Sequence, residues 1–222
     1  MPEAQRLTYP VHLLSLGSFG GAVGSYLSAL RTDVLETKLA AKMAPSSGAW
    51  PMARIRVVAA WRPVQALCRQ LDDLSYQNGQ PFIPLVLDST LLQLGPVVVP
   101  GCGPCWGCSA QRNRQHATSL AGNAALCEFY DNDWEAGPRG YFEPFALMAA
   151  GRVSETIDAI DCATALPGQV WQIDLLTRKT SAARAIGIDG CPRCGLGRQA
   201  ATRGFSDLQT QLAYLWAKNV QD

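Results

Sequence analysis

Residues 11–24 read VHLLSLGSFGGAVG, and they carry the clearest signal for the fold. Its first six residues, Val11 to Leu16, form a short apolar run of the kind that becomes a buried strand. Glycines follow at once, and a helical pattern then continues to Leu30. Because a strand, a glycine turn and a helix open a nucleotide-binding βαβ unit, we predict an α/β protein with a Rossmann-like sheet.

The glycine turn departs from the dinucleotide-binding fingerprint Gly-x-Gly-x-x-Gly. With Gly17 as its first glycine, Phe19 stands at the second position and Ala22 at the third. The second glycine normally lets the backbone approach a pyrophosphate, so a side chain there predicts a vestigial phosphate turn (Gly17, Gly20, Gly21). We therefore expect the fold without ATP binding.

Glu36 follows the turn by about twenty residues, where an acid can bind a ribose hydroxyl. A single carboxylate at that distance is more often a surface residue.

Further elements follow in order, after a loop at residues 44–51. Strands are predicted at residues 55–60, 82–87, 94–99, 170–175 and 186–188, and helices at residues 64–71, 112–130 and 143–160, the last interrupted near Gly151. The 112–130 helix would carry Leu120, Ala124 and Cys127 on one face. A final helix begins at the capping box Ser206-Asp207-Leu208-Gln209, and its stripe Leu208, Leu212 and Leu215 packs on this protein or faces a partner.

Composition narrows the class of protein. The 222 residues are 48% apolar, enough to bury a core, and their net charge of +1 indicates neither nucleic acid nor an anionic membrane as a partner. We expect Arg112, Arg114 and His116 to form a solvated face. Residues 7–30 carry no charged side chain, but four glycines and four serines make them too polar for a membrane span, so we expect a cytoplasmic protein.

Eight cysteines indicate a metal site better than a disulfide scaffold. Two Cys-x-x-Cys pairs, Cys105 with Cys108 and Cys191 with Cys194, each lie beside Pro and Gly. Two such turns can hold one structural Zn²⁺ with four thiolates and leave it no open position for catalysis. Cys102 is less clear, because it could replace one ligand, form a redox pair with Cys105, or take no part.

The other cysteines and the two histidines are expected to be structural. Cys68, Cys127 and Cys162 are predicted as small core residues. His12 should lie on a buried strand and His116 beside the first cysteine pair, and neither forms an evident acid-base pair.

These motifs together resemble the ThiF-like (ubiquitin-activating-like) leader-binding subunits of azole-forming peptide modification systems of the microcin and streptolysin types. The shared features are Gly95-Pro96-Val97-Val98-Val99-Pro100-Gly101, then Cys105-Trp106-Gly107-Cys108 with Arg112, and the late Cys191-Pro192-Arg193-Cys194 after a hairpin. The resemblance covers about Val11 to Gly195.

The resemblance implies a structural Zn²⁺ held by Cys105, Cys108, Cys191 and Cys194, with Cys102 as an extra cysteine. It also implies a subunit that presents a ribosomally made precursor peptide to an ATP-dependent YcaO-type cyclodehydratase, with a flavin dehydrogenase as a possible later partner and a homodimer as a possible state. Such subunits usually begin with a winged-helix peptide clamp, and only ten residues precede the first strand here. A separate clamp protein could bind the leader, or this chain could mainly scaffold and activate the enzyme.

Two other functions remain open from the residues alone. The first is a ThiF-like enzyme that adenylates a carboxylate with ATP and magnesium, and the second is a dinucleotide oxidoreductase. The adenylating enzyme is supported by the opening strand, glycine turn and helix together with the four-cysteine arrangement, and the oxidoreductase by the turn alone.

The predicted organisation has four parts: an N-terminal extension (1–10), a Rossmann-like region (11–100), a zinc-clamped lobe of helices and a hairpin (101–195), and a C-terminal helix (196–222).

Overall fold

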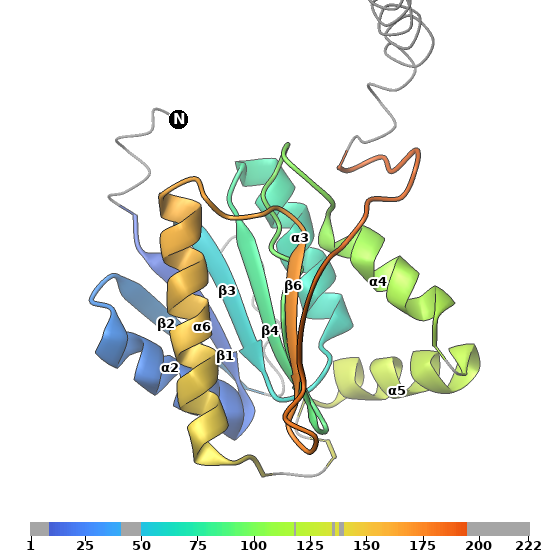
Figure 1. Ribbon diagram of the computed structural model, residues 1–222, viewed down its shortest axis with the longest axis horizontal. Helices are drawn as coiled ribbons and strands as arrows, with labels where there is room; N and C mark the ends of the chain where they lie inside the picture. The colour runs from blue at the N-terminus through green and yellow to red at the C-terminus, as the bar shows by residue number, and fades with distance from the viewer. Residues whose placement is uncertain (1–8, 41–49, 118, 135, 138–139, 195–222) are drawn as a thin grey trace, which may run out of the picture.

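A computed structural model describes residues 9–40, 50–117, 119–134, 136–137 and 140–194. They form one seven-stranded sheet with the order β2-β1-β3-β4-β5-β6-β7 (Figure 1). The first four strands are parallel and the last three are antiparallel additions. The strands are β1 (Val11–Leu16), β2 (Val34–Leu39), β3 (Ile55–Ala60), β4 (Phe82–Asp88), β5 (Leu91–Leu94), β6 (Gln169–Asp174) and β7 (Thr180–Arg184).

Helices cover both faces of this sheet. On one face lie α2 (Gly17–Leu30) and α6 (Glu143–Asp161), and on the other lies α3 (Gln65–Asn78) (Figure 1). Two more helices, α4 (Trp106–Gln115) and α5 (Leu120–Asn132), extend from the α3 side. This layered arrangement confirms the predicted Rossmann-like α/β fold.

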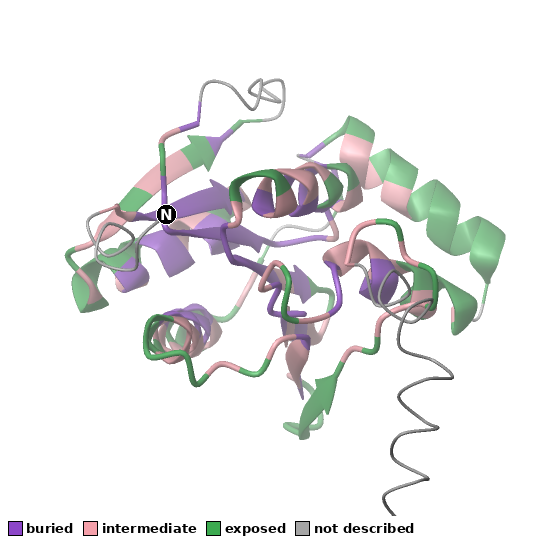
Figure 2. Ribbon diagram, turned by 90° about the horizontal axis from the view of Figure 1, so that it is seen from above, coloured by how far each residue is buried: buried purple, intermediate pink, exposed green. Residues whose placement is uncertain are grey.

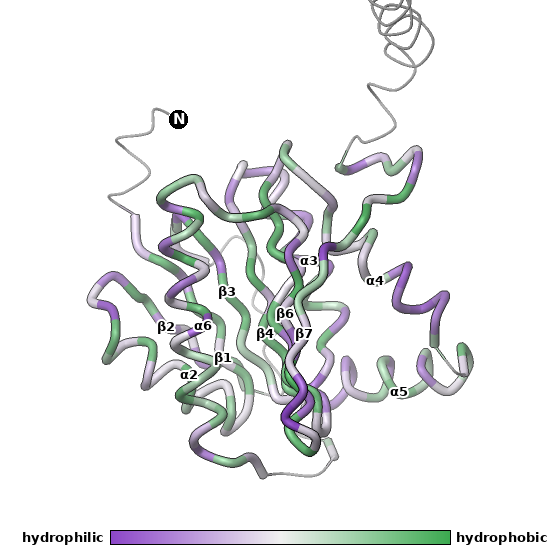
Figure 3. Tube along the Cα trace, viewed as in Figure 1, coloured by the Kyte–Doolittle hydropathy of each residue, from purple (hydrophilic) through white to green (hydrophobic). Residues whose placement is uncertain are grey.

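The core is centred on β1 and β3, whose residues are all buried (Figure 2). Their near-continuous apolar sequences are what a parallel strand with both faces covered requires, and Figure 3 shows the same strands as hydrophobic. Helix α6 packs closely on α2 through buried small residues at helical spacing: Ala146, Ala149, Ala150 and Val153.

An ion network holds the end of α6 against the sheet. Arg54, which is buried, contacts Asp33 at 2.6 Å and Asp161 at 2.9 Å, and Arg31 contacts Asp158 at 2.5 Å. The network joins β2 and β3 to the last turn of α6.

Several predicted elements differ from the structure. The segment 112–130 is not one helix, because α4 ends at Gln115 and α5 begins at Leu120, capped by the Ser119 side chain. No residue of α5 is buried, so its predicted apolar face does not pack on the core. Helix α6 continues through Gly151 without interruption.

The observed bounds of several strands also differ from the predicted ones. The strand predicted at 94–99 ends at Leu94, and beyond it only Val98 makes an isolated bridge to Phe82. The strand predicted at 186–188 is instead β7, five residues long and ending at Arg184. Strand β2 was not predicted.

The three cysteines that were predicted to be core residues differ in burial. Cys68 is buried, Cys127 is partly buried, and Cys162 is exposed just after α6, so the prediction for Cys162 was wrong.

Other predictions lie partly beyond the described residues. The final helix falls wholly outside them, and within them no helix is long and apolar enough to cross a membrane. The sheet includes strands from both sides of residue 100. The division of the chain into a Rossmann-like region and a zinc-clamped lobe at that residue stays a prediction.

Candidate metal centre

Four cysteine sulfurs meet beside the N-terminus of α4. The Sγ atoms of Cys105, Cys108, Cys191 and Cys194 all lie within 4.8 Å of one another. Neighbouring pairs are 3.6 Å (Cys105–Cys108), 3.8 Å (Cys105–Cys191) and 3.6 Å (Cys108–Cys194) apart. A tetrahedron with Zn–S bonds of about 2.3 Å has edges of about 3.8 Å, so the cluster has the size and donor chemistry of a Zn²⁺ site.

The first pair is positioned by the start of a helix. Cys105 is the residue before α4, and Cys108 lies on its first turn, so one turn of chain aims both sulfurs the same way. The backbone N–H groups of Trp106 and Gly107 donate to the carboxylate of Asp72 at 3.0 and 3.2 Å. Asp72 on α3 therefore caps α4, although no acid stands near this helix start in the sequence.

The second pair is tied to the same carboxylate. Arg193, between Cys191 and Cys194, forms ion pairs with Asp72 and Asp73. Asp72 is fully buried and thus joins both cysteine pairs to α3. Sequence reasoning missed this link, because Asp72 and Arg193 are 121 positions apart.

Further hydrogen bonds hold the segment after β7 against α4. Arg112 donates to the carbonyl oxygens of Ile186 and Gly187 at 2.8 and 3.1 Å. The N–H of Ile188 donates to Cys108 Sγ at 3.3 Å, as expected of a thiolate ligand with surrounding support. Arg112 was expected on a solvated face, but it holds the chain after β7 against α4.

The thiols differ in acidity. Burial raises the pKa of Cys105, and burial also raises the pKa of Cys108, to about 11. For Cys191, burial opposes ionisation, but the backbone N–H groups of Cys194 and Arg193 lower its pKa to about 7. A bound Zn²⁺ would deprotonate all four, and the nearby Arg193 would offset part of their charge.

Cys102 lies outside this cluster. Its side chain is exposed, and its backbone N–H donates to the Val99 carbonyl. The four-cysteine group forms without it.

The glycine turn is closed by an aromatic side chain, although not the expected one. Helix α2 starts at Gly17 directly after β1, with φ of +69°, and the Trp61 indole lies where a Cβ on Gly17 would stand, 2.6 Å away. Phe19 is instead buried in the core against Tyr141, so the predicted obstruction by Phe19 was wrong. Gly20 packs on the Ala59 carbonyl, where a Cβ would come within 2.3 Å.

Trp61 is held in place on both sides. Its indole N–H donates to the Trp134 carbonyl at 3.4 Å, and the Arg62 guanidinium stacks on its ring at 4.1 Å. A cavity of about 330 Å³ remains beside the turn, lined by Ser15, Gly17, Ser18, Gly21, Lys38, Leu39, Ala40 and Trp61.

Glu36 does not face this cavity. It accepts a 2.6 Å hydrogen bond from the Ser15 hydroxyl, and its carboxylate lies over Gly24 of α2. It therefore joins β2 to β1 and α2.

The two histidines are structural or exposed, as predicted. His12 is buried between Thr37 (2.9 Å) and Arg56 (2.8 Å), and burial together with the Arg56 charge lowers its pKa to about 4. His116 ends α4 and is exposed.

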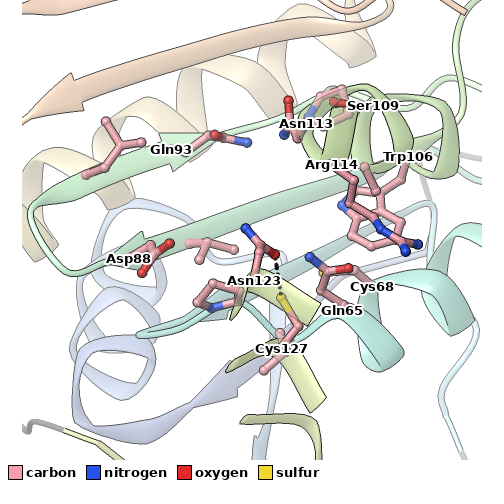
Figure 4. Close-up of a pocket in the computed structure, with 16 residues that line it drawn as sticks. Gln65, Cys68, Asp88, Gln93, Trp106, Ser109, Asn113, Arg114, Asn123 and Cys127 are labelled. Atoms are coloured by element: carbon pink, nitrogen blue, oxygen red, sulfur yellow. Dashed lines mark hydrogen bonds between the residues drawn. The ribbon is translucent and has the colours of Figure 1, made fainter. Parts of the chain in front are cut away.

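A second cavity, of about 190 Å³, lies between the sheet and helices α3, α4 and α5 (Figure 4). Figure 4 shows the amides of Gln65, Gln93, Asn113 and Asn123 around it. Cys127 donates to Asn123, and burial raises the pKa of this thiol, which makes it a poor nucleophile. The cavity offers hydrogen bonds, and sequence reasoning did not anticipate it.

No protein-family model and no curated protein matches the chain. Solved structures do: the heterocyclase TruD (18% identity, TM-score 0.62) and a heterocyclase in complex with substrate and cofactor (19%, 0.61) each align with 91% of this chain. E. coli MccB with AMPCPP and MccA aligns with 87% of it (15%, 0.61).

This chain spans 30% and 28% of the two heterocyclase chains and 68% of MccB. At these identities the likeness concerns the fold. The protein thus has a fold similar to that of heterocyclase TruD and MccB, with four cysteines arranged as a metal site could require.

Proposed function

We propose that this protein is a non-catalytic, zinc-binding subunit of a complex that modifies ribosomally made peptides. In this role it presents a precursor peptide to a YcaO-type ATP-dependent cyclodehydratase, or scaffolds and activates that enzyme. A separate peptide-clamp protein and a flavin dehydrogenase complete the proposed set of partners.

The four-cysteine cluster is the observation that carries this proposal. Four sulfurs at tetrahedral spacing leave a zinc ion no open position, so its role is structural. It joins the start of α4 to the chain after β7, through residues 86 positions apart. Such a site fixes a surface on which partners can assemble.

The closed glycine turn supports a role without nucleotide chemistry. The Trp61 ring lies against Gly17, the first glycine of the turn, and takes up space beside the backbone there. Trp61 is itself held by Trp134 and Arg62, so moving it would break those contacts.

The exposed surface of α5 supports association with another protein. Leu120, Leu126 and Phe129 are all exposed on this helix, which buries none of its residues. Leu126 and Phe129 are three residues apart and therefore lie on one side of the helix, and exposed apolar side chains on one side of a helix are typical of protein interfaces.

The fold likeness agrees with this class of system. The similar structures include a heterocyclase with substrate and cofactor and MccB with MccA. Both are larger than this chain, so the transfer of a peptide-related function is our proposal.

Co-purification of this protein with a YcaO-type enzyme encoded beside it tests the proposal. We expect one zinc per chain and a stable complex, and we expect Cys108→Ser to lose both together. A protein without zinc, or one that does not associate with the enzyme, would contradict it.

One observation favours an adenylating enzyme as the second candidate. The cavity beside the turn keeps Ser18 and Lys38, and MccB has been solved with ATP. Carboxylate-dependent pyrophosphate exchange by this protein alone would establish that function.

A further inference from the structure

Strand β7 lies at a free edge of the sheet. Its neighbour on one side is β6, and no described strand pairs with its other side. All five residues of β7 are exposed (Figure 2, lower edge). A strand with an unpaired side presents backbone donors and acceptors to any extended chain.

The register shows which groups are unpaired. Asp174 N–H donates to the Lys179 carbonyl, and Ala185 N–H donates to the Gly168 carbonyl. Because hydrogen-bonded pairs alternate along an antiparallel ladder, Ser181 and Ala183 direct their N–H and C=O groups toward β6. The N–H and C=O groups of Thr180, Ala182 and Arg184 therefore point outward.

The side chains along this edge are small between two charged ends. Thr180, Ser181, Ala182 and Ala183 leave room for bulky side chains of an incoming strand. Arg178 and Lys179 precede them, and Arg184 ends the strand.

The charge at this edge is positive. Residues 175–188 contain no acid, and Asp174 is the carboxylate nearest to Lys179 along the ladder. Arg184 donates to the Pro167 carbonyl, which leaves its charge uncompensated by that contact.

A second copy of this chain fits the edge poorly. If two β7 strands paired antiparallel about Ala182, Arg184 of each copy would face Thr180 of the other and lie diagonally across from its Arg178. Like charges at that spacing oppose pairing. An extended segment with acidic residues near both ends can pair with the same backbone groups, and its charges are attracted to the basic side chains at the two ends of β7.

We propose that the outer edge of β7 binds an extended, acidic segment of a peptide as an additional strand. The inference rests on the proposed function in taking a precursor peptide as the natural ligand. Backbone hydrogen bonds at Thr180, Ala182 and Arg184 give affinity, and the basic ends select acidic sequences and set their position. Basic residues also protect free edges from aggregation, and the experiment separates the two roles.

The test uses the zinc-loaded full chain and two labelled octapeptides. Both have a Thr-Val-Thr-Val centre, and one is flanked by Glu pairs and the other by Lys pairs. We expect fluorescence anisotropy to show binding of the acidic peptide, roughly tenfold tighter than the basic one at low salt. The acidic peptide should slow amide exchange at Thr180, Ala182 and Arg184, and leave Ser181 and Ala183 unchanged.

Two variants locate the site. Ala182→Pro removes an outward N–H without removing a bond to β6, and should abolish binding, whereas Ala182→Val keeps that N–H and should bind normally. The double variant Arg178→Glu and Lys179→Glu should reverse the preference between the two peptides. A basic edge that only protects against aggregation would show no binding of either peptide, which would overturn the proposal.

The outcome is distinguishable from failure of the proposed function. Ala182→Pro should keep its zinc and its association with the YcaO-type enzyme while losing the peptide. If the acidic peptide and the precursor bind Ala182→Pro as they bind the unaltered protein, the edge is not the site, although the subunit role stands. If the unaltered protein binds the acidic peptide but neither holds zinc nor joins the enzyme, the subunit role fails and the edge stands.

Discussion

Asp72 is the residue on which both cysteine pairs depend. It is fully buried, caps α4 through Trp106 and Gly107, and pairs with Arg193. Replacing it by Asn removes the charge but keeps the shape. Since loss of a group that orients metal ligands usually costs 10–100-fold in affinity, we expect Asp72→Asn to weaken zinc binding by roughly that factor. Competition with a chromogenic chelator measures it.

Asp73→Asn is the matched control. Asp73 also pairs with Arg193, but its side chain is 43% exposed and caps no helix. We expect little change in zinc affinity. Equal losses in the two variants would contradict the role assigned to Asp72.

His12 makes stability depend on pH. Its pKa falls from 6.5 to about 4 in the folded protein through burial and the Arg56 charge. Between about pH 6.5 and pH 4, His12 is therefore protonated in the unfolded chain but neutral in the folded protein. Stability from this group is therefore present above pH 6.5 and lost as the pH falls toward 4, by up to roughly 3 kcal/mol.

Urea unfolding of the protein and of His12→Gln at pH 8, 6.5 and 4.5 tests this. Acid also weakens zinc binding, because the metal's ligands must be thiolates, but that effect is common to both proteins. The difference between their unfolding free energies should shrink in acid. A constant difference would show that His12 does not titrate in this range.

Among the helices and strands, α5 differs most from the sequence-based prediction, and its exposed surface is where we expect a partner to bind. Phe129→Glu should leave the fold intact, because the side chain is 54% exposed, and should weaken binding to the YcaO-type enzyme about tenfold or more. Leu30→Glu on α2, equally exposed at 54%, is the control. Surface plasmon resonance with the immobilised enzyme compares the two, and equal affinities would exclude α5 from the interface.

Sequence patterns predicted elements well where burial was uniform. Strands β1, β3 and β4 are near-continuous apolar runs between two helical layers, so their composition identified them. Strand β2 reads VLETKL, lies at the other edge and lacks such a run, so it was missed. The helix break at residues 116–119 carries neither Gly nor Pro, and only Ser119 signals a new cap.

The candidate site was predictable in part for a related reason. Cys-x-x-Cys spacing is local and survives in the sequence as a motif, so all four sulfurs could be named. The supporting contacts of Asp72, Arg112 and Ile188 join segments distant in sequence, and no local pattern encodes them. The same holds for Trp61, whose contact with Gly17 depends on strand order.

Across the whole molecule, we expect zinc to order the segments around the four cysteines and to leave the central strands of the sheet unchanged. Chelation should speed amide exchange at Trp106, Gly107 and Ile188, whose hydrogen bonds depend on the cluster. The β1 amides should remain protected, because every residue of β1 is buried and none belongs to the segments that carry the four clustered cysteines. Exchange that rises equally throughout the chain would mean that the metal instead holds the entire fold together.

ATP consumption in the presence of precursor peptide distinguishes a non-catalytic subunit from an enzyme. It is measured for this protein alone, for the YcaO-type enzyme alone, and for both together. We predict that only the pair consumes ATP rapidly, and that the zinc-free Cys108→Ser variant gives no such increase. Rapid ATP consumption by this protein alone, or an enzyme that is equally fast without it, would contradict a zinc-ordered, non-catalytic subunit.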